Sequence, residues 1–239
     1  MLLPQKFLQT MEEKIISIYF IDNFEGSGMT MEVYDKKGNM YIVLFLNPEI
    51  FRQNITEWIN LRENTYFDYN QDFVISAECS KEYYALLFAL LHEASHIYDY
   101  YYHITPFTEP KLKNKHSPEK TDFTNAVWID HSKPFTEYDF PYRNELFAWG
   151  LGPAQNRTFA MDIYSSISKT PFASIYGSQN WAEDFAEAFT WYYLDKLLDC
   201  SYRVMVTNNA GTSKETFIYE PMKNPLLLKR VDFLAPISN

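Results

Sequence analysis

The sequence predicts an α+β fold, in which β-hairpins accompany two helices that carry clustered histidines and glutamates. Runs of β-forming residues separated by turns occupy the first 50 residues, which predicts strands. Residues 81–102 and 181–198 instead space their apolar residues as amphipathic helices do. The hydrophobic content of 46% is that of a globular protein. We expect one domain over 1–239, with a hairpin-and-helix part at 1–75 and a helical part at 76–239.

The N-terminal part is expected to begin with a short helix at 4–15 and a strand at Ile15–Ile21. Residues 29–34 and 40–46 flank the turn sequence Asp35-Lys-Lys-Gly-Asn39, and this arrangement predicts a β-hairpin. Asn47 followed by Pro48 predicts a helix that starts there and runs to about residue 60.

Residues 103–142 hold five of the 12 prolines and show little periodicity, which indicates a long irregular insertion. It either walls a functional cleft or is a surface excursion, and a short strand at 126–129 is one option within it. The remaining expected elements are a short helix at 144–149, a helix at 159–168, a second hairpin at 202–207 and 216–219, and a tail at 225–234 that docks on the body.

Residues 92–96 read His-Glu-Ala-Ser-His, and on a helix this spacing places two imidazoles on one face. His92 and His96 lie one turn apart and can bind the same metal ion. The carboxylate of Glu93 lies slightly round the helix, where it can reach a water on that ion. This is the HExxH spacing of zinc hydrolases, with two ligands and a general base. The sequence therefore predicts a Zn²⁺ site.

The surrounding residues favour the helix that this motif requires. Residues 81–102 lack glycine and proline, and we expect Ser80 to cap the helix start. Two imidazoles and a carboxylate are costly to bury on an apolar helix unless something pairs with them. A metal ion is the simplest partner, and the alternative is a pair of core histidines that hydrogen-bond to other groups.

A catalytic zinc usually has three protein ligands, so a third must come from elsewhere. The metzincin extension is excluded, because Asp99 and Tyr102 stand where that pattern needs glycine and histidine. Asp99 lies about 10 Å from His92 along a straight helix, so we expect it to hold a histidine or a nearby backbone group. Other candidates are the later histidines His103, His116 and His131.

The segment 181–198 offers a better third ligand. Glu183 and Glu187 stand one helical turn apart beside apolar residues, where like charges repel. A cation between this helix and the HExxH helix would remove the repulsion. We therefore expect Glu183 to be the ligand and Glu187 to hydrogen-bond a ligand imidazole. The alternative is a solvated acidic face.

Residues 176–189 read Tyr-Gly-Ser-Gln-Asn-Trp-Ala-Glu-Asp-Phe-Ala-Glu-Ala-Phe. Together with the HExxH motif, they resemble the zinc-binding segments of the anthrax lethal factor metalloproteases and the related bacterial Pro-Pro endopeptidases, which are gluzincin-type enzymes. The resemblance implies a zincin-like metalloprotease domain, with a small mixed sheet packed on the HExxH helix and a C-terminal helix that bears the glutamate ligand. Carried over, the ligands are His92, His96 and Glu183, the base is Glu93, and Tyr176 points into the site.

The resemblance also implies a function, a zinc-dependent endopeptidase that acts on a polypeptide substrate. Tyr176 would donate a hydrogen bond to the oxyanion, and the alternative is a structural tyrosine in an aromatic-rich loop. In zincins an edge strand beside the active-site helix binds the substrate backbone. We expect 40–46 to be that strand, with a core strand as the alternative. Two other functions stay open: a catalytically inactive zinc-binding interaction module, and an interaction protein with a chance motif.

The composition limits the classes of partner that we expect the protein to bind. The net charge of −10 argues against nucleic acid, because phosphate binding needs a basic face. The short basic cluster at Lys111–Lys115 indicates a solvated loop. No apolar run reaches the ~18 residues of a membrane span.

Cellular location is not fixed by the sequence. No signal peptide is recognisable, so we expect either a cytoplasmic protein or a secreted or cell-surface protein whose signal has been removed, and the resemblance favours the second. Cys79 precedes the HExxH helix and Cys200 follows the Glu183 helix. If these helices run antiparallel, both cysteines lie at the same end, where a disulfide and two free thiols are both possible.

Overall fold

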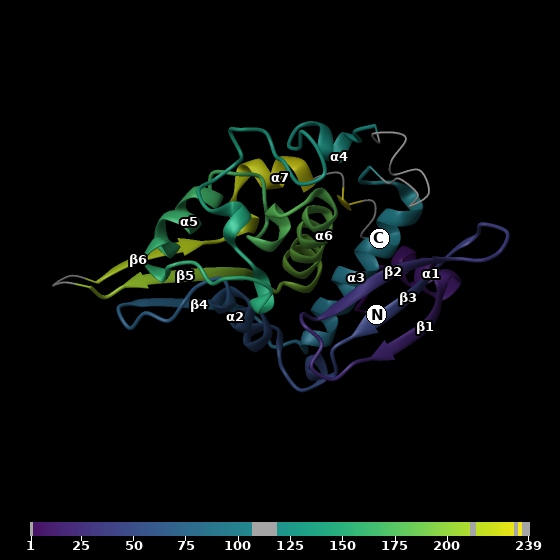
Figure 1. Ribbon diagram of the computed structural model, residues 1–239, viewed down its shortest axis with the longest axis horizontal. Helices are drawn as coiled ribbons and strands as arrows, with labels where there is room; N and C mark the ends of the chain where they lie inside the picture. The colour runs from purple at the N-terminus through teal and green to yellow at the C-terminus, as the bar shows by residue number, and fades with distance from the viewer. Residues whose placement is uncertain (1, 107–118, 211–213, 232–233, 236–239) are drawn as a thin grey trace.

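The computed structural model describes residues 2–106, 119–210, 214–231 and 234–235. Over these residues the fold is α+β, as expected, with seven α-helices and two three-stranded sheets. Figure 1 shows the sheets to either side of two long helices, α3 (Ala85–Tyr102) and α6 (Trp181–Leu198). One cluster of buried apolar side chains extends from Phe7 to Leu234 and joins these layers.

The first sheet has the strand order β1-β3-β2. Its strands are β1 (Ile15–Phe20), β2 (Gly28–Tyr34) and β3 (Met40–Leu46), and β3 runs parallel to β1 and antiparallel to β2. The expected hairpin is therefore present, but the expected edge strand is wrong, because β3 is central. Its uninterrupted apolar run suits a strand with a neighbour on each side. The edge next to α3 belongs to β2, whose Thr30 hydrogen-bonds Glu93.

The helices of the N-terminal part differ from expectation in one place. Helix α1 (Gln5–Lys14) and the cap at Asn47 occur where predicted, but a short 3₁₀ helix at Pro48–Phe51 follows the cap. A separate helix, α2 (Ile55–Thr65), then starts. The break has a local cause: Asn54 and Glu57 form a reciprocal capping box that begins a new helix.

The second sheet is antiparallel and has the order β4-β5-β6. Strands β5 (Tyr202–Asn208) and β6 (Glu215–Tyr219) form the expected second hairpin. Strand β4 (Phe73–Cys79), which lies in a stretch where no strand was expected, pairs with β5. This pairing crosses the boundary expected at residue 75, so the two parts of the chain share a sheet.

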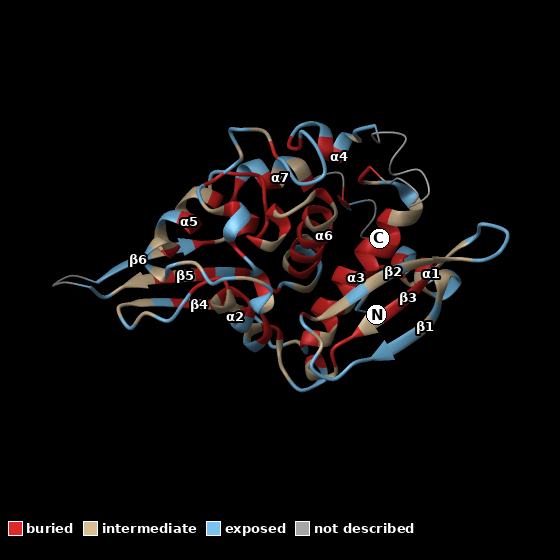
Figure 2. Ribbon diagram, in the orientation of Figure 1, coloured by how far each residue is buried: buried red, intermediate tan, exposed pale blue. Residues whose placement is uncertain are grey.

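Helices α3 and α6 run antiparallel, and their buried faces are coloured red in Figure 2. The segment before α3 meets the end of α6, where Ser80 Oγ donates to Asp199 O and Tyr83 Oη donates to Leu198 O. Helix α3 therefore begins at Ala85, four residues later than expected. Ser80 is not its cap, because its hydroxyl binds the chain that follows α6 instead.

Cys79 and Cys200 lie at this same end, as antiparallel helices require. Both are free thiols. The hydrogen bond with Cys200, together with burial, raises the pKa of the Cys79 thiol well above its ordinary value. Of the two possibilities that the sequence left open, the structure has two free thiols side by side.

The insertion at 103–142 is only partly described, and His116 and Lys111–Lys115 lie outside the described residues. A single bridge between Trp128 and Pro134 replaces the optional strand. The short helix expected at 144–149 is two 3₁₀ turns, because the backbone of Leu146 and Phe147 between them is extended. The remaining helical elements are α4 (Asp122–Asn125), α5 (Ala160–Ile167), α7 (Pro225–Val231) and 3₁₀ turns at Arg143–Glu145, Ala148–Gly150, Arg157–Phe159, Tyr176–Ser178 and Pro221–Lys223.

None of the helices in the described ranges has both the length and the apolar character that crossing a bilayer demands.

The tail docks on the body, as expected, through a buried ion pair. Arg230 of α7 binds both carboxylate oxygens of Asp184, with Nη1 2.9 Å from Oδ1. Trp128 Nε1 donates to the same carboxylate at 2.7 Å. Asp184 is fully buried in the first turn of α6, so α7 and the insertion together anchor the start of that helix.

Replacing Arg230 with methionine should therefore lower the free energy of unfolding by about 3 kcal/mol, because it leaves a buried carboxylate without its partner. Chemical denaturation measures this loss. Lys229→Met, at an exposed position one residue earlier on the same helix, is the matched control and should change stability by less than about 0.5 kcal/mol. Equal stability of the two variants would contradict this role for Arg230.

Candidate metal centre

Helix α3 holds both histidines and the glutamate of the HExxH motif in the interior. His92, Glu93 and His96 are 4%, 2% and 8% exposed. Leucine, alanine and phenylalanine side chains surround them on the same helix, which explains how a polar triplet is carried into the core. Thr30 of β2 donates from Oγ1 to Glu93 Oε2 at 2.8 Å and fixes that carboxylate.

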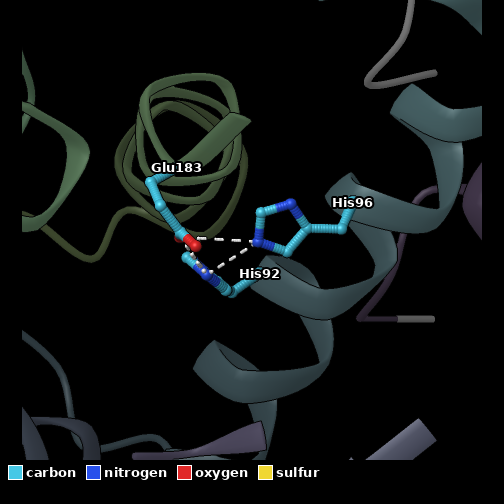
Figure 3. A group of neighbouring side chains, drawn as sticks. All are labelled: His92, His96 and Glu183. Atoms are coloured by element: carbon cyan, nitrogen blue, oxygen red, sulfur yellow. Dashed lines mark hydrogen bonds and ion pairs between the residues drawn. The ribbon is translucent and has the colours of Figure 1, made fainter. Parts of the chain in front are cut away.

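Helix α6 brings Glu183 to the same place from a distant part of the sequence. The side chain of Asn180 caps the helix and accepts from the backbone N–H groups of Ala182 and Glu183, both at 3.0 Å. This cap fixes the first turn, and Glu183 extends from it towards α3 (Figure 3). Its side chain is 21% exposed, so it reaches the site from the side that faces solvent.

Three ligand atoms form a compact triangle between the two helices. Nε2 of His92 lies 3.2 Å from Nε2 of His96, and Oε2 of Glu183 lies 3.1 Å and 3.5 Å from these two nitrogens. Zinc bonds of about 2.0–2.1 Å in tetrahedral geometry place ligand atoms about 3.3–3.4 Å apart. The cluster His92, His96 and Glu183 could therefore hold a metal ion.

The electrostatics of the cluster favour positive charge at this point. Burial disfavours the charged imidazole of His92, but Glu183 and Glu187 outweigh this effect and raise its pKa to about 10. Glu183 shifts the pKa of His96 in the same direction, also against burial. Despite its own burial, Glu183 has a pKa far below its ordinary value, because both imidazoles stabilise its charge. A metal cation would satisfy the same demand.

Glu187, which was expected from the sequence to hydrogen-bond a ligand imidazole, lies next to Nδ1 of His92. Its Oε1 is 3.3 Å from His92 Nδ1, slightly longer than a well-formed hydrogen bond. Its Oε2 accepts from Ser174 Oγ at 2.6 Å and from Trp191 Nε1 at 3.0 Å. Burial opposes the charge of Glu187, but Arg62 and His92 lower its pKa to about 2.

Sequence reasoning missed Arg62 and Glu63, which complete this buried cluster from α2. The two residues are 1% and 0% exposed. A charged pair inside an apparently amphipathic helix resembles ordinary surface residues in sequence, so no local signal marks it. Its importance comes only from the approach of α2 to α6.

Tyr176 lies at the cavity, in the 3₁₀ turn that precedes α6. Its ring centre is 5.9 Å from that of His92. The negative charge of Glu183 and burial raise the pKa of the Tyr176 hydroxyl well above its ordinary value. The hydroxyl therefore stays protonated and able to donate a hydrogen bond.

Asp99 holds the backbone rather than an imidazole. Its two oxygens accept from the N–H and the hydroxyl of Thr105, both at 2.6 Å, where the chain leaves α3. His103 ends α3 in a left-handed conformation and lies outside the triangle. His131 belongs to the insertion and lines the cavity, so the described part of this segment does contribute to the cavity wall.

A cavity of about 430 Å³ opens onto the triangle. The edge strand β2 contributes Gly28, Met29 and Thr30 to one wall. Gly28 has no room for a side chain, because a Cβ there would lie 2.8 Å from Phe45 O and 3.1 Å from Glu93 Oε1. Trp149 and Leu151 line another part of the cavity. The three residues of the cluster also line the wall of this cavity.

Comparisons with known protein families, with curated proteins and with solved structures found no match for this chain. The interpretation of the site therefore depends on the residues of this chain and their geometry.

The raised pKa of His92 makes the stability of the metal-free protein depend on pH. The folded pKa of about 10 exceeds the ordinary 6.5, so this contribution is complete below pH 6.5 and is lost as pH rises towards 10. Thermal unfolding in the presence of a chelator should show a midpoint that falls steadily between pH 6.5 and 9.

His92→Gln should make this slope shallower and leave only the part that the raised pKa of His96 contributes, whereas His131→Gln, outside the triangle, should retain the full slope. Zinc should also flatten the profile, because a ligating imidazole is neutral in the metal-bound form. A metal-free profile that is equally flat in the parent and in His92→Gln would contradict the electrostatic description of the site.

Proposed function

We propose that this protein is a zinc-dependent endopeptidase with a zincin-like fold. The observation that carries the proposal is the triangle of His92, His96 and Glu183, whose atoms have the spacing of a tetrahedral zinc site. The buried carboxylate of Glu93 belongs to the same helix turn. Two histidines, a glutamate from a later helix and an adjacent base are the donor set of zinc hydrolases.

When bound by these three residues, zinc supplies Lewis acidity, which makes water nucleophilic near neutral pH. Proton transfer belongs to Glu93. Burial raises the pKa of its carboxyl group, although both imidazoles and Thr30 act in the opposite direction. A base of raised pKa accepts a proton from water more readily and can return it to the leaving amine. The hydroxyl of Thr30 keeps the carboxylate oriented during this exchange.

Tyr176 is the proposed donor to the carbonyl oxygen of the substrate. It lies beside His92 and remains protonated, for the reasons given above. A donor fixed before reaction stabilises the negative charge that develops on this oxygen, and the loss of one such donor typically costs about 3 kcal/mol.

The edge of β2 supports a polypeptide substrate in an extended conformation. This strand pairs with β3 on one side, and its residues Gly28 to Thr30 line the cavity on the other. An extended peptide that adds to such an edge gains main-chain hydrogen bonds and passes over the triangle. β2 therefore takes the role that the sequence had suggested for β3.

Glu93→Gln should reduce cleavage by at least about 100-fold, because it removes the general base. Bound zinc and the thermal midpoint should stay close to those of the parent, since the amide has the same shape and the metal ligands remain. A diverse peptide library with mass spectrometry reveals cleavage, and Glu82→Gln, at an exposed position before α3, is the control.

Undiminished cleavage by the Glu93→Gln variant would reject the proposed mechanism. A parent protein that binds zinc but cleaves no peptide of the library would instead support the inactive zinc-binding module.

Tyr176→Phe should lower kcat by about 100-fold and leave KM nearly unchanged, because the lost hydrogen bond forms mainly in the transition state. Steady-state kinetics on a peptide from the library separate the two parameters. Tyr69→Phe, at a tyrosine that is 86% exposed, is the matched control and should behave as the parent does. A kcat for Tyr176→Phe within twofold of the parent value would assign Tyr176 a purely structural role.

A further inference from the structure

Arg62 is a buried charged residue that the proposed mechanism does not use. Helix α2 carries it to the interior, where 1% of the residue is exposed. Its guanidinium lies 5.7 Å from the ring centre of Phe88 and 5.6 Å from that of Tyr176. A guanidinium that is so deeply buried needs hydrogen-bond acceptors for the N–H groups on both of its sides.

Two glutamates are those partners, and they have different neighbours. Arg62 Nε donates to Glu63 Oε1 at 3.0 Å, and Nη1 donates to Glu187 Oε1 at 2.9 Å. Glu63 connects Arg62 to a residue outside the metal centre, because its other oxygen accepts a hydrogen bond from Tyr164 Oη at 2.6 Å. Glu187 connects Arg62 to the metal centre, because its Oε1 also faces Nδ1 of the proposed ligand His92.

Glu187 has little freedom to turn. Ser174 and Trp191 hold Oε2, so the position of Oε1 depends on Arg62. That oxygen sits between a permanent cation and the nitrogen of His92 that points away from the metal centre. A hydrogen bond from Nδ1 fixes the ring so that Nε2 presents its lone pair to a metal ion.

We propose that Arg62 is a positioning residue for the ligand His92 and acts through Glu187. The inference rests on the proposed zinc site and extends it to a residue from a third helix. Arg62 holds one carboxylate oxygen at a fixed place, and this oxygen orients the imidazole. Without the guanidinium, Glu187 would be a buried carboxylate held on one oxygen alone, and His92 would lose its fixed acceptor.

The other end of the fork supplies a matched control. Tyr164→Phe removes a hydrogen bond to Glu63 at the same depth, since Tyr164 is also fully buried, but it leaves the contacts among Arg62, Glu187 and His92 intact. A purely structural role for Arg62 predicts that both variants lose stability and that neither changes metal affinity. A positioning role predicts that only the Arg62 variant binds the metal more weakly.

The test measures zinc affinity of the full chain by competition with a chromophoric chelator. Arg62→Met, of similar length and without charge, should raise the Kd for zinc by about 10–100-fold, the range typical of lost outer-shell contacts to ligands. Arg62→Lys keeps the charge but not the fork, and its Kd should lie between that of the parent and that of Arg62→Met. Tyr164→Phe should bind zinc within about twofold of the parent while melting at a lower temperature.

Hydrogen exchange is a second measurement, and it reports on the imidazole of His92 directly. In the ¹⁵N-labelled zinc-bound protein, the Nδ1–H proton of His92 should be protected from exchange in the parent and in Tyr164→Phe, and should exchange rapidly in Arg62→Met. If Arg62→Met does not fold, Arg62→Lys decides: a Kd equal to that of the parent would overturn the proposal. Equal zinc affinity in a folded Arg62→Met would overturn it directly. Failure of the parent to bind zinc would reject the zinc site itself, which is a different outcome.

Discussion

The arrangement of this protein depends on an excess of negative charge that is buried where three helices meet. Two buried glutamates, Glu63 and Glu187, contact the buried guanidinium of Arg62, and the carboxylates of Glu93 and Glu183 lie at the neighbouring candidate metal centre. Charges that leave water are tolerated only when they are paired. The elevated pKa values of both imidazoles show how the metal-free protein would meet this demand, by protonation. A divalent cation bound by the three candidate ligands would also balance this negative charge, and the imidazoles would then not need to be protonated.

The helices that carry these charged residues are held in place by contacts outside the candidate metal centre. α3 and α6 run antiparallel and are joined at one end by a contact between Tyr83 and Leu198, while the candidate metal centre lies between them. α6 is held at its start by Arg230, through Asp184, the residue directly after the proposed ligand Glu183. Helix α7 thus helps to hold the helix turn that carries Glu183, although α7 is distant from this turn in sequence and contributes no proposed ligand.

The sequence was sufficient for those features that are encoded locally. Spacing within one helix predicted that His92 and His96 share a face, and the i, i+4 spacing predicted the same for Glu183 and Glu187 on α6. The hairpins followed from turn residues between apolar runs. The features that were missed depend on partners far away in the chain: β4 has no strong pattern and is stabilised by pairing with β5, and β2 becomes the edge only because β3 inserts between β1 and β2. Arg62 was invisible for the same reason, since its significance lies in a contact with a glutamate 125 residues later.

The most direct test of this account is the zinc content and affinity of the protein, purified without added metal and then titrated under chelator competition. The account predicts one tightly bound zinc per chain and a large loss of affinity when Glu183 is replaced by glutamine. Glu119→Gln, an exposed position in the insertion, should leave affinity unchanged. A parent protein without stoichiometric zinc that also fails to bind it on titration, or a Glu183→Gln variant that binds it as tightly as the parent, would contradict the account.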